Sequence, residues 1–94
     1  MTETQLKNKV LKYLKEIPYC FVYKACDRFT SGIPDILCCI KGKFIAIELK
    51  VGDNLPTKIQ RYIGQQIRLA GGICFIAYSL KNVKEQLTFN NIII

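Results

Sequence analysis

Two carboxylates in this chain are spaced so that a β-hairpin would bring them face to face. Residues 35–40 and 44–49 are apolar apart from Asp35 and Glu48 and are expected to be strands, and Lys41-Gly42 between them predicts a two-residue turn with Gly42 in the turn. In the register of such a turn Asp35 lies directly opposite Glu48, with the two Cβ atoms about 4.5–5.5 Å apart. A three-residue loop would shift the pairing by one residue and separate the two acids.

Lys50 joins this pair because it is two residues beyond Glu48, and side chains two apart on a strand share a face. The apolar side chains of the other face are expected to point into a core; they are Ile36, Cys38, Ile40, Ile45, Ile47 and Leu49. The hairpin therefore predicts two acids and one ammonium group together on one face of a sheet.

Two carboxylates at this distance repel each other, so either one keeps a proton or a cation compensates both. Carboxylates on a rigid frame are natural ligands for Mg²⁺ or Mn²⁺. Such an ion polarises a phosphoryl oxygen and supplies a nucleophile, which is the chemistry of phosphodiester hydrolysis. Lys50 would orient or deprotonate the attacking water, or neutralise charge that develops on the phosphate.

Each of these residues also has an ordinary structural interpretation. Asp35 follows Pro34 and suits a turn, Glu48 suits a solvent-facing position, and Glu48 with Lys50 suits a surface ion pair. The chain has only seven acidic residues, so the grouping of all three side chains on one face favours a functional site.

The remaining composition narrows the chemistry. The absence of histidine excludes a Ser-His-Asp triad, a Cys-His pair and a histidine general base. The five cysteines show no C-x-x-C spacing, so a structural zinc site is not expected. The net charge of +7 favours a polyanionic partner, most often nucleic acid, although a solvated surface and membrane binding are alternatives that composition does not exclude.

Length and hydropathy indicate one folded domain, residues 1–94, because 50% of the 94 residues are hydrophobic. No apolar run approaches the roughly 20 residues that span a bilayer, and no apolar signal region follows the polar N-terminus. We therefore expect a protein without a membrane partner that stays in the cytosol of its cell or host.

Periodicity predicts the elements that position the acids. Helices are expected from Thr2, where Thr2 to Gln5 fits a capping box, to the residue before Pro18, over residues 57–70, and briefly after Ser79. Strands are expected over residues 19–24, 35–40, 44–49 and 73–78, and the last is apolar enough to be central.

This order predicts an α/β fold with a mixed sheet of about four strands flanked by helices, in which the second helix is the crossover to the fourth strand. The apolar end, residues 92–94, suits either a dimer interface or a final strand of the protein's own sheet.

Two segments in this order resemble a known nuclease signature, PD-(D/E)xK. They are Gly32-Ile33-Pro34-Asp35-Ile36-Leu37 and Phe44-Ile45-Ala46-Ile47-Glu48-Leu49-Lys50. With Gly42 ahead of Glu48, then Gln60, then Gly71-Gly72, the chain resembles more narrowly the virus-type replication-repair nuclease (VRR-NUC) domain. The resemblance runs from about Gly32 to Ser79; each short motif is weak alone, and their order and spacing carry it.

The resemblance implies a restriction-endonuclease-like core and a phosphodiesterase that depends on Mg²⁺, with Mn²⁺ as a substitute. It implies that Asp35 and Glu48 bind the metal, that the Leu49 carbonyl completes the shell, and that Lys50 is the catalytic lysine. An acidic residue of the first helix often joins such a site, and only Glu3 lies suitably early in this chain. The alternative for Glu3 is a first-turn acid that the helix dipole favours.

Gln60 also has two interpretations. The resemblance places it beside the metal site as a catalytic residue. Thr57-x-x-Gln60 also fits a capping box, in which the Gln60 side chain caps its own helix. We expect one side chain not to do both at once.

The remaining basic residues are expected to contact DNA phosphates, which supply affinity and position rather than sequence information. The candidates are Arg28, Lys58, Arg61, Arg68 and Lys24. The alternative for each is a solvated charge.

The resemblance implies a structure-selective endonuclease that acts as a homodimer on branched DNA, such as a Holliday-junction resolvase. No separate domain for reading sequence is recognisable, which favours recognition of DNA shape, and the small size of the chain disfavours a restriction-type enzyme. The alternative from another class is a basic nucleic-acid-binding module without catalysis, in which the acids are structural and no Mn²⁺ binds.

Overall fold

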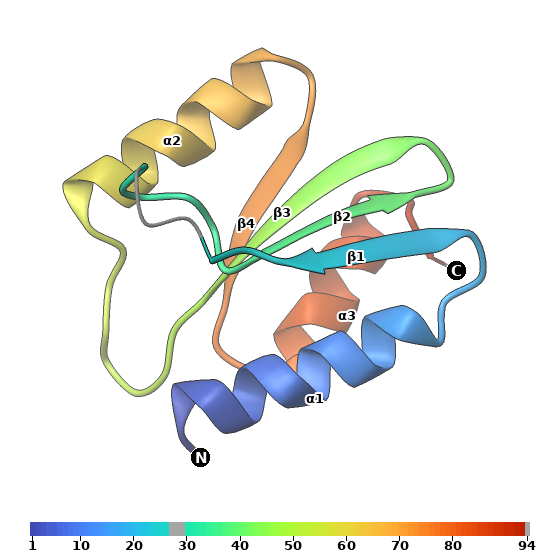
Figure 1. The fold of residues 1–94 in the computed structure, drawn as a ribbon, viewed down its shortest axis with the longest axis horizontal. Helices are drawn as coiled ribbons and strands as arrows, with labels where there is room; N and C mark the ends of the chain where they lie inside the picture. Colours follow the sequence, from blue (N-terminus) through green and yellow to red (C-terminus); the bar gives the residue numbers. More distant parts are fainter. Residues whose placement is uncertain (27–29, 94) are drawn as a thin grey trace.

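The computed structural model describes residues 1–26 and 30–93. In this part of the chain three helices and four strands follow in the order helix, three strands, helix, strand, helix (Figure 1). Their bounds are α1 Glu3–Lys15, β1 Cys20–Lys24, β2 Ile36–Ile40, β3 Lys43–Leu49, α2 Lys58–Leu69, β4 Ile73–Ala77 and α3 Leu80–Phe89. The predicted α/β fold with a mixed sheet is confirmed.

Each helix begins at a side chain that caps it. Thr2 and Gln5 form the predicted capping box of α1, Thr57 and Gln60 form that of α2, and Ser79 caps α3. These caps satisfy backbone N–H groups that the first helical turn leaves without partners. Among the described residues, none of the helices is both long enough and apolar enough to cross a bilayer.

The sheet is an antiparallel meander, β1-β2-β3, extended by β4, which is parallel to β3. The turn between β2 and β3 is the predicted two-residue loop, and Lys41 and Gly42 both have positive φ, 50° and 85°. Two successive positive φ values suit a tight turn that matches the twist of the strands. Ile40 pairs with Lys43, which confirms the register on which the meeting of Asp35 and Glu48 depends.

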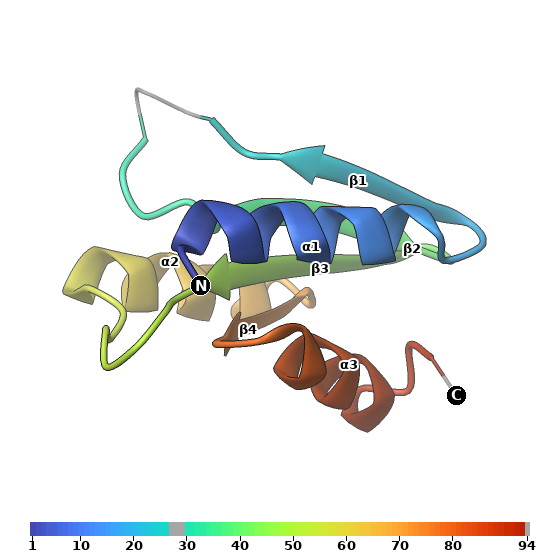
Figure 2. The same ribbon diagram turned by 90° about the horizontal axis from the view of Figure 1, so that it is seen from below.

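The core lies between the sheet and the pair of helices α1 and α3; Figure 2 shows α1 in front of β2 and β3. Alternation along β2 and β3 turns the predicted apolar residues into this core; all six, Ile36, Cys38, Ile40, Ile45, Ile47 and Leu49, are at most 3% exposed. The helices contribute Leu6, Val10 and Leu14 from α1 and Val83 and Leu87 from α3. The hairpin is therefore anchored on one face, which leaves its other face free to carry polar groups.

The prediction that the fourth strand is central was wrong, because β4 lies at the edge of the sheet. The crossover through α2 returns the chain to the free side of β3, and β3 becomes the buried strand instead. β4 is apolar because it contacts α3 on one face and α2 on the other. The apolar composition of β4 therefore follows from packing against two helices and not from a position between two strands.

The apolar end of the chain does not form the alternative final strand in the residues that the structure describes. Ile92 follows α3, is 7% exposed and belongs to the core, and Ile93 packs against that core. Ile94 lies outside the described residues. Core packing therefore accounts for the apolar character of Ile92 and Ile93.

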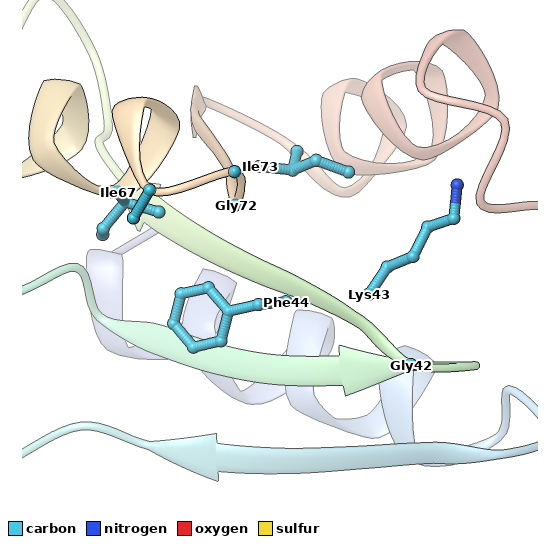
Figure 3. Close-up of a pocket in the computed structure, with 8 residues that line it drawn as sticks. Gly42, Lys43, Phe44, Ile67, Gly72 and Ile73 are labelled. Atoms are coloured by element: carbon cyan, nitrogen blue, oxygen red, sulfur yellow. The ribbon is translucent and has the colours of Figure 1, made fainter.

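The face of β1, β2 and β3 that points away from α1 exposes large apolar side chains. Phe21, Tyr23 and Phe44 are 72%, 56% and 44% exposed, and the strand pairing places Leu37 and Cys39 between them. We call these five residues the apolar strip; they line a shallow hollow together. Figure 3 shows the Phe44 ring on this side of the sheet.

Candidate metal-binding active site

Asp35 and Glu48 meet where β2 begins and β3 ends. Asp35 directly precedes β2, and its backbone carbonyl accepts a hydrogen bond from the N–H of Ala25 at 2.9 Å. Its side chain turns toward β3, where Oδ2 accepts a hydrogen bond from the backbone N–H of Leu49 at 2.8 Å. The Asp35 carboxylate thus accepts a hydrogen bond that a backbone carbonyl of β2 would accept if the strand pairing continued, and it lies beside Glu48.

Among the described residues, Glu48 is the only acidic one that is buried, with 6% of its surface exposed. Its Oε2 accepts a hydrogen bond from Gln60 Nε2 at 3.2 Å and lies 3.6 Å from Lys50 Nζ. Burial, the charge of Asp35 and a hydrogen bond with Asp35 together raise the pKa of Glu48 to about 7, and burial is the largest cause. The Lys50 ammonium opposes the rise, and the charge of Glu3 adds to it.

The raised pKa of Glu48 predicts a specific dependence of stability on pH. Its ordinary pKa is 4.5 and its folded value is about 7, so between these values the folded state binds more protons than the unfolded state. In chelator, the free energy of unfolding should therefore fall as pH rises through this window, by up to about 3 kcal/mol. Urea unfolding between about pH 5 and pH 8 measures it.

Glu48→Gln is the matched control for this pH dependence, because it keeps an acceptor for Gln60 and removes the titrating group. The chain has no histidine, so no other side chain has an ordinary pKa inside the window. The variant should lose much less stability than the natural chain as pH rises. Parallel pH profiles of the two proteins would show that Glu48 is not the group responsible.

Lys50 lies on the same face as Glu48, as the strand alternation predicts, and its side chain is 13% exposed. A second ammonium group reaches the site from α1, because Lys7 Nζ lies 3.5 Å from Asp35 Oδ1. In the sequence Lys7 is one of four lysines between residues 7 and 15, and no motif singles it out. The available signal was its position one turn after Glu3, the spacing at which an acid and a lysine share a helix face.

The expectation that Gln60 would either cap its helix or join the site was wrong, because its amide does both. Gln60 Oε1 accepts a hydrogen bond from the Thr57 N–H at 2.8 Å, and Nε2 donates to Glu48 at 3.2 Å. A primary amide has an acceptor end and a donor end, so the two bonds do not compete. The first turn of α2 is thereby tied to the carboxylate.

Gly32 holds the loop in front of Asp35 against the start of α2. Its φ is +85°, and an added Cβ would lie 2.9 Å from the backbone oxygen of Ile59 and 3.0 Å from its carbonyl carbon. Backbone atoms cannot move aside as a flexible side chain can. The position therefore requires glycine both for its φ and for its closeness to the helix that carries Gln60.

Gly32→Ala is expected to lower the free energy of unfolding by about 2–4 kcal/mol, because left-handed strain and overpacking add. Gly42→Ala is the matched control: Gly42 has the same φ of +85° with nothing within 4 Å of the added Cβ, so about 1–2 kcal/mol is expected. Urea unfolding of both variants measures the difference. Equal losses would contradict the contact between Gly32 and α2.

The oxygen ligands at this site fit a hard divalent cation. Asp35 and Glu48 supply two neighbouring carboxylates. The N–H and C=O of a strand residue face the same neighbour, so the Leu49 carbonyl faces the side on which its N–H meets Asp35. Mg²⁺ commonly binds one or two carboxylates and keeps several waters.

Glu3 is partly buried, and its charge acts on Glu48. The described residues contain no group of three acidic, cysteine or histidine side chains placed to hold one ion together. A role for Glu3 as a third carboxylate ligand stays a prediction.

The structure separates the basic residues that were expected to bind phosphate. Lys24 and Lys58 are exposed, and Arg28 lies outside the described residues. Arg61 donates to the Pro56 carbonyl and Arg68 to the Cys74 carbonyl, at 3.2 and 3.0 Å. Both arginines line a cavity of about 100 Å³, and Glu48 and Gln60 line the same cavity. Cationic groups therefore border the acids on the α2 side.

A larger hollow of about 600 Å³ lies at the opposite end of β3 (Figure 3). Gly42, Phe44, Ile67 and Gly72 are among its lining residues, and Lys43 is its one charged member. Of the residues that the structure describes, no acidic one lines this hollow. The candidate site is therefore the smaller cavity beside Glu48.

Two solved structures share this fold. One, described as "VRR_NUC domain", matches with a TM-score of 0.79 over 92% of this chain and 94% of its own length, at 22% sequence identity. Another, described as "VRR_NUC domain protein", matches with a TM-score of 0.78 over 94% of this chain and 86% of its own, at 18% identity. No protein-family model and no curated protein matches the chain. The chain thus has the fold of VRR-NUC domains, as its motifs suggested.

Proposed function

We propose that this protein is a metal-dependent nuclease that hydrolyses phosphodiester bonds in DNA. The observation that carries the proposal is the pairing of Asp35 with the buried Glu48, flanked by Lys50, on a fold shared with VRR-NUC domains. Burying a carboxylate next to another one is unfavourable, and a cation bound there by an enzyme would compensate the two negative charges. The net charge of +7 suits a nucleic-acid substrate.

In this proposal Asp35, Glu48 and the Leu49 carbonyl hold Mg²⁺, for which Mn²⁺ substitutes. A metal ion held by these residues would supply polarisation of the scissile phosphate and activation of a water molecule. Gln60 keeps the Glu48 carboxylate in place through its amide, which α2 fixes at the other end. Lys50 contributes its ammonium group at the edge of the carboxylate pair, where it neutralises charge on the phosphate or handles the proton of the attacking water.

We propose further that the substrate is branched DNA, such as a four-way junction, and that the enzyme is a homodimer. Two symmetric cuts in a junction need two sites related by a twofold axis. The apolar strip offers a surface for the second copy, since its aromatic side chains are exposed in one chain. Five free cysteines suit a reducing compartment, and we expect the enzyme to act in the cytoplasm of a bacterial or phage-infected cell.

The test of function is incubation with labelled four-way junction, flap, linear duplex and single strand, in Mg²⁺, in Mn²⁺ and in chelator. Cleavage of the junction with either metal, and none in chelator, is the expected result. Binding to DNA without cleavage of any substrate, together with no uptake of Mn²⁺, would instead identify a nucleic-acid-binding module.

The test of the dimer is sedimentation of the natural chain and of Phe21→Ser. Phe21 is 72% exposed, so the substitution does not disturb the core of a single chain. A dimer that becomes a monomer in the variant is the expected result. A natural chain that sediments as a monomer at micromolar concentration would refute the dimer and leave the nuclease proposal standing.

A further inference from the structure

The two oxygens of the Asp35 carboxylate have different partners. Oδ2 accepts the hydrogen bond from the Leu49 N–H, which fixes the side chain to β3. Oδ1 lies 3.5 Å from Lys7 Nζ, and the two side chains are 19% and 18% exposed. The oxygen that is not bound to the backbone is therefore the one next to a fixed cation from α1.

We propose that Lys7 is the counter-ion of Asp35 in the metal-free protein. When the divalent metal ion binds Asp35, Lys7 leaves this carboxylate and contacts the DNA phosphate. This inference rests on the proposed function, because it assigns Asp35 as a metal ligand. A divalent ion on Oδ1 and an ammonium group at the same oxygen repel each other at short range in a partly buried site. Lys7 and the metal therefore compete for Asp35.

The ammonium group that leaves Asp35 remains on α1 beside the site. The anion that enters with the substrate is the phosphodiester, and a lysine binds phosphate as a mobile point charge. Lys50 lies beside Glu48 at the other acid, so the phosphate would approach a pair of acids with one ammonium group beside each. Lys7 would thus lower metal affinity in the free protein and raise DNA affinity in the metal-loaded protein.

Calorimetric titration with Mn²⁺ at low ionic strength and about pH 8 tests the competition. Lys7→Met is expected to bind Mn²⁺ at least about fivefold more tightly than the natural chain, as is typical of coupling between two sites. Lys9→Met is the matched control: Lys9 is an exposed lysine of the same helix, and its removal should leave the affinity unchanged. Lys7→Arg, which keeps the charge, should restore weak binding.

The salt dependence of junction binding tests the transfer to phosphate. It is measured in a Lys50→Met background, so that cleavage is slow. With Mn²⁺ present, Lys7→Met should reduce the slope of log affinity against log salt by about one, the value for one lost phosphate contact. In chelator, where Lys7 stays with Asp35, the slope should not change.

The outcomes separate this inference from the proposed function. If the natural chain takes up no Mn²⁺, the nuclease proposal and the inference fail together. If Mn²⁺ binds through Asp35 and the affinity is unchanged or weaker in Lys7→Met, the inference alone is wrong. Lys7→Gln is a second variant, which removes the same charge with a side chain of different shape. Loss of folding in both Lys7→Met and Lys7→Gln would mean that the ion pair of Lys7 with Asp35 is structural, and would overturn the inference.

Discussion

Asp35→Asn and Glu48→Gln are each expected to reduce the rate of junction cleavage by at least about a thousandfold. The reason is that metal-ion catalysis supplies several kcal/mol of stabilisation to the transition state, and each 1.36 kcal/mol corresponds to a factor of ten in rate. Both changes remove a negative charge from the site and keep nearly the same side-chain volume. Initial rates with Mg²⁺ on labelled four-way junction measure the loss.

Mn²⁺ titration of the same two variants shows whether the loss has the proposed cause. Both should bind the ion at least about a hundredfold more weakly, while junction binding in chelator persists because the basic surface is intact. Asp53→Asn is the matched control, since Asp53 is an exposed acid of the loop between β3 and α2. Undiminished cutting by either site variant would rule out the assignment.

Folding of these variants has to be measured as well, because Asp35 also holds the Leu49 N–H. Asparagine keeps an oxygen that accepts this hydrogen bond, so we expect Asp35→Asn to remain folded. Glu48→Gln should be at least as stable as the natural chain near pH 8, since ionised Glu48 is unfavourable in the folded state. Loss of folding in both would mean that the acids are structural.

Lys50→Met is expected to lower the cleavage rate by about a hundredfold to ten-thousandfold while Mn²⁺ still binds. The ammonium group lies 3.6 Å from Glu48, close enough to act on a phosphate that a metal ion at this carboxylate would hold. Lysine is not itself a ligand of the metal ion, so its loss removes charge or proton transfer rather than the ion. Single-turnover rates together with Mn²⁺ titration separate the two effects.

Lys50→Arg distinguishes the two roles of Lys50. Arginine keeps the positive charge but does not give up its proton at neutral pH. Recovery of most of the rate would assign charge neutralisation, whereas a loss as large as that of methionine would favour proton transfer. Lys81→Met, which removes an exposed lysine of α3, is the control and should cleave at the natural rate.

The sequence determined the local parts of this protein. Thr2 with Gln5 and Thr57 with Gln60 predicted where two helices begin, because a capping box involves residues only three apart. The turn at Lys41-Gly42 predicted the pairing of β2 with β3, because a two-residue loop leaves one register. From that register alone Asp35, Glu48 and Lys50 could be placed together.

Only the tertiary structure decided which residues join the acids from distant parts of the chain. Lys7 meets Asp35 because α1 packs beside the sheet, and no local pattern specifies which turn of that helix reaches the end of β2. Gln60 reaches Glu48 because the crossover sets α2 beside β4, and the same crossover makes β4 an edge strand. Periodicity shows which face of an element is apolar, whereas its neighbours are fixed by packing of the whole core.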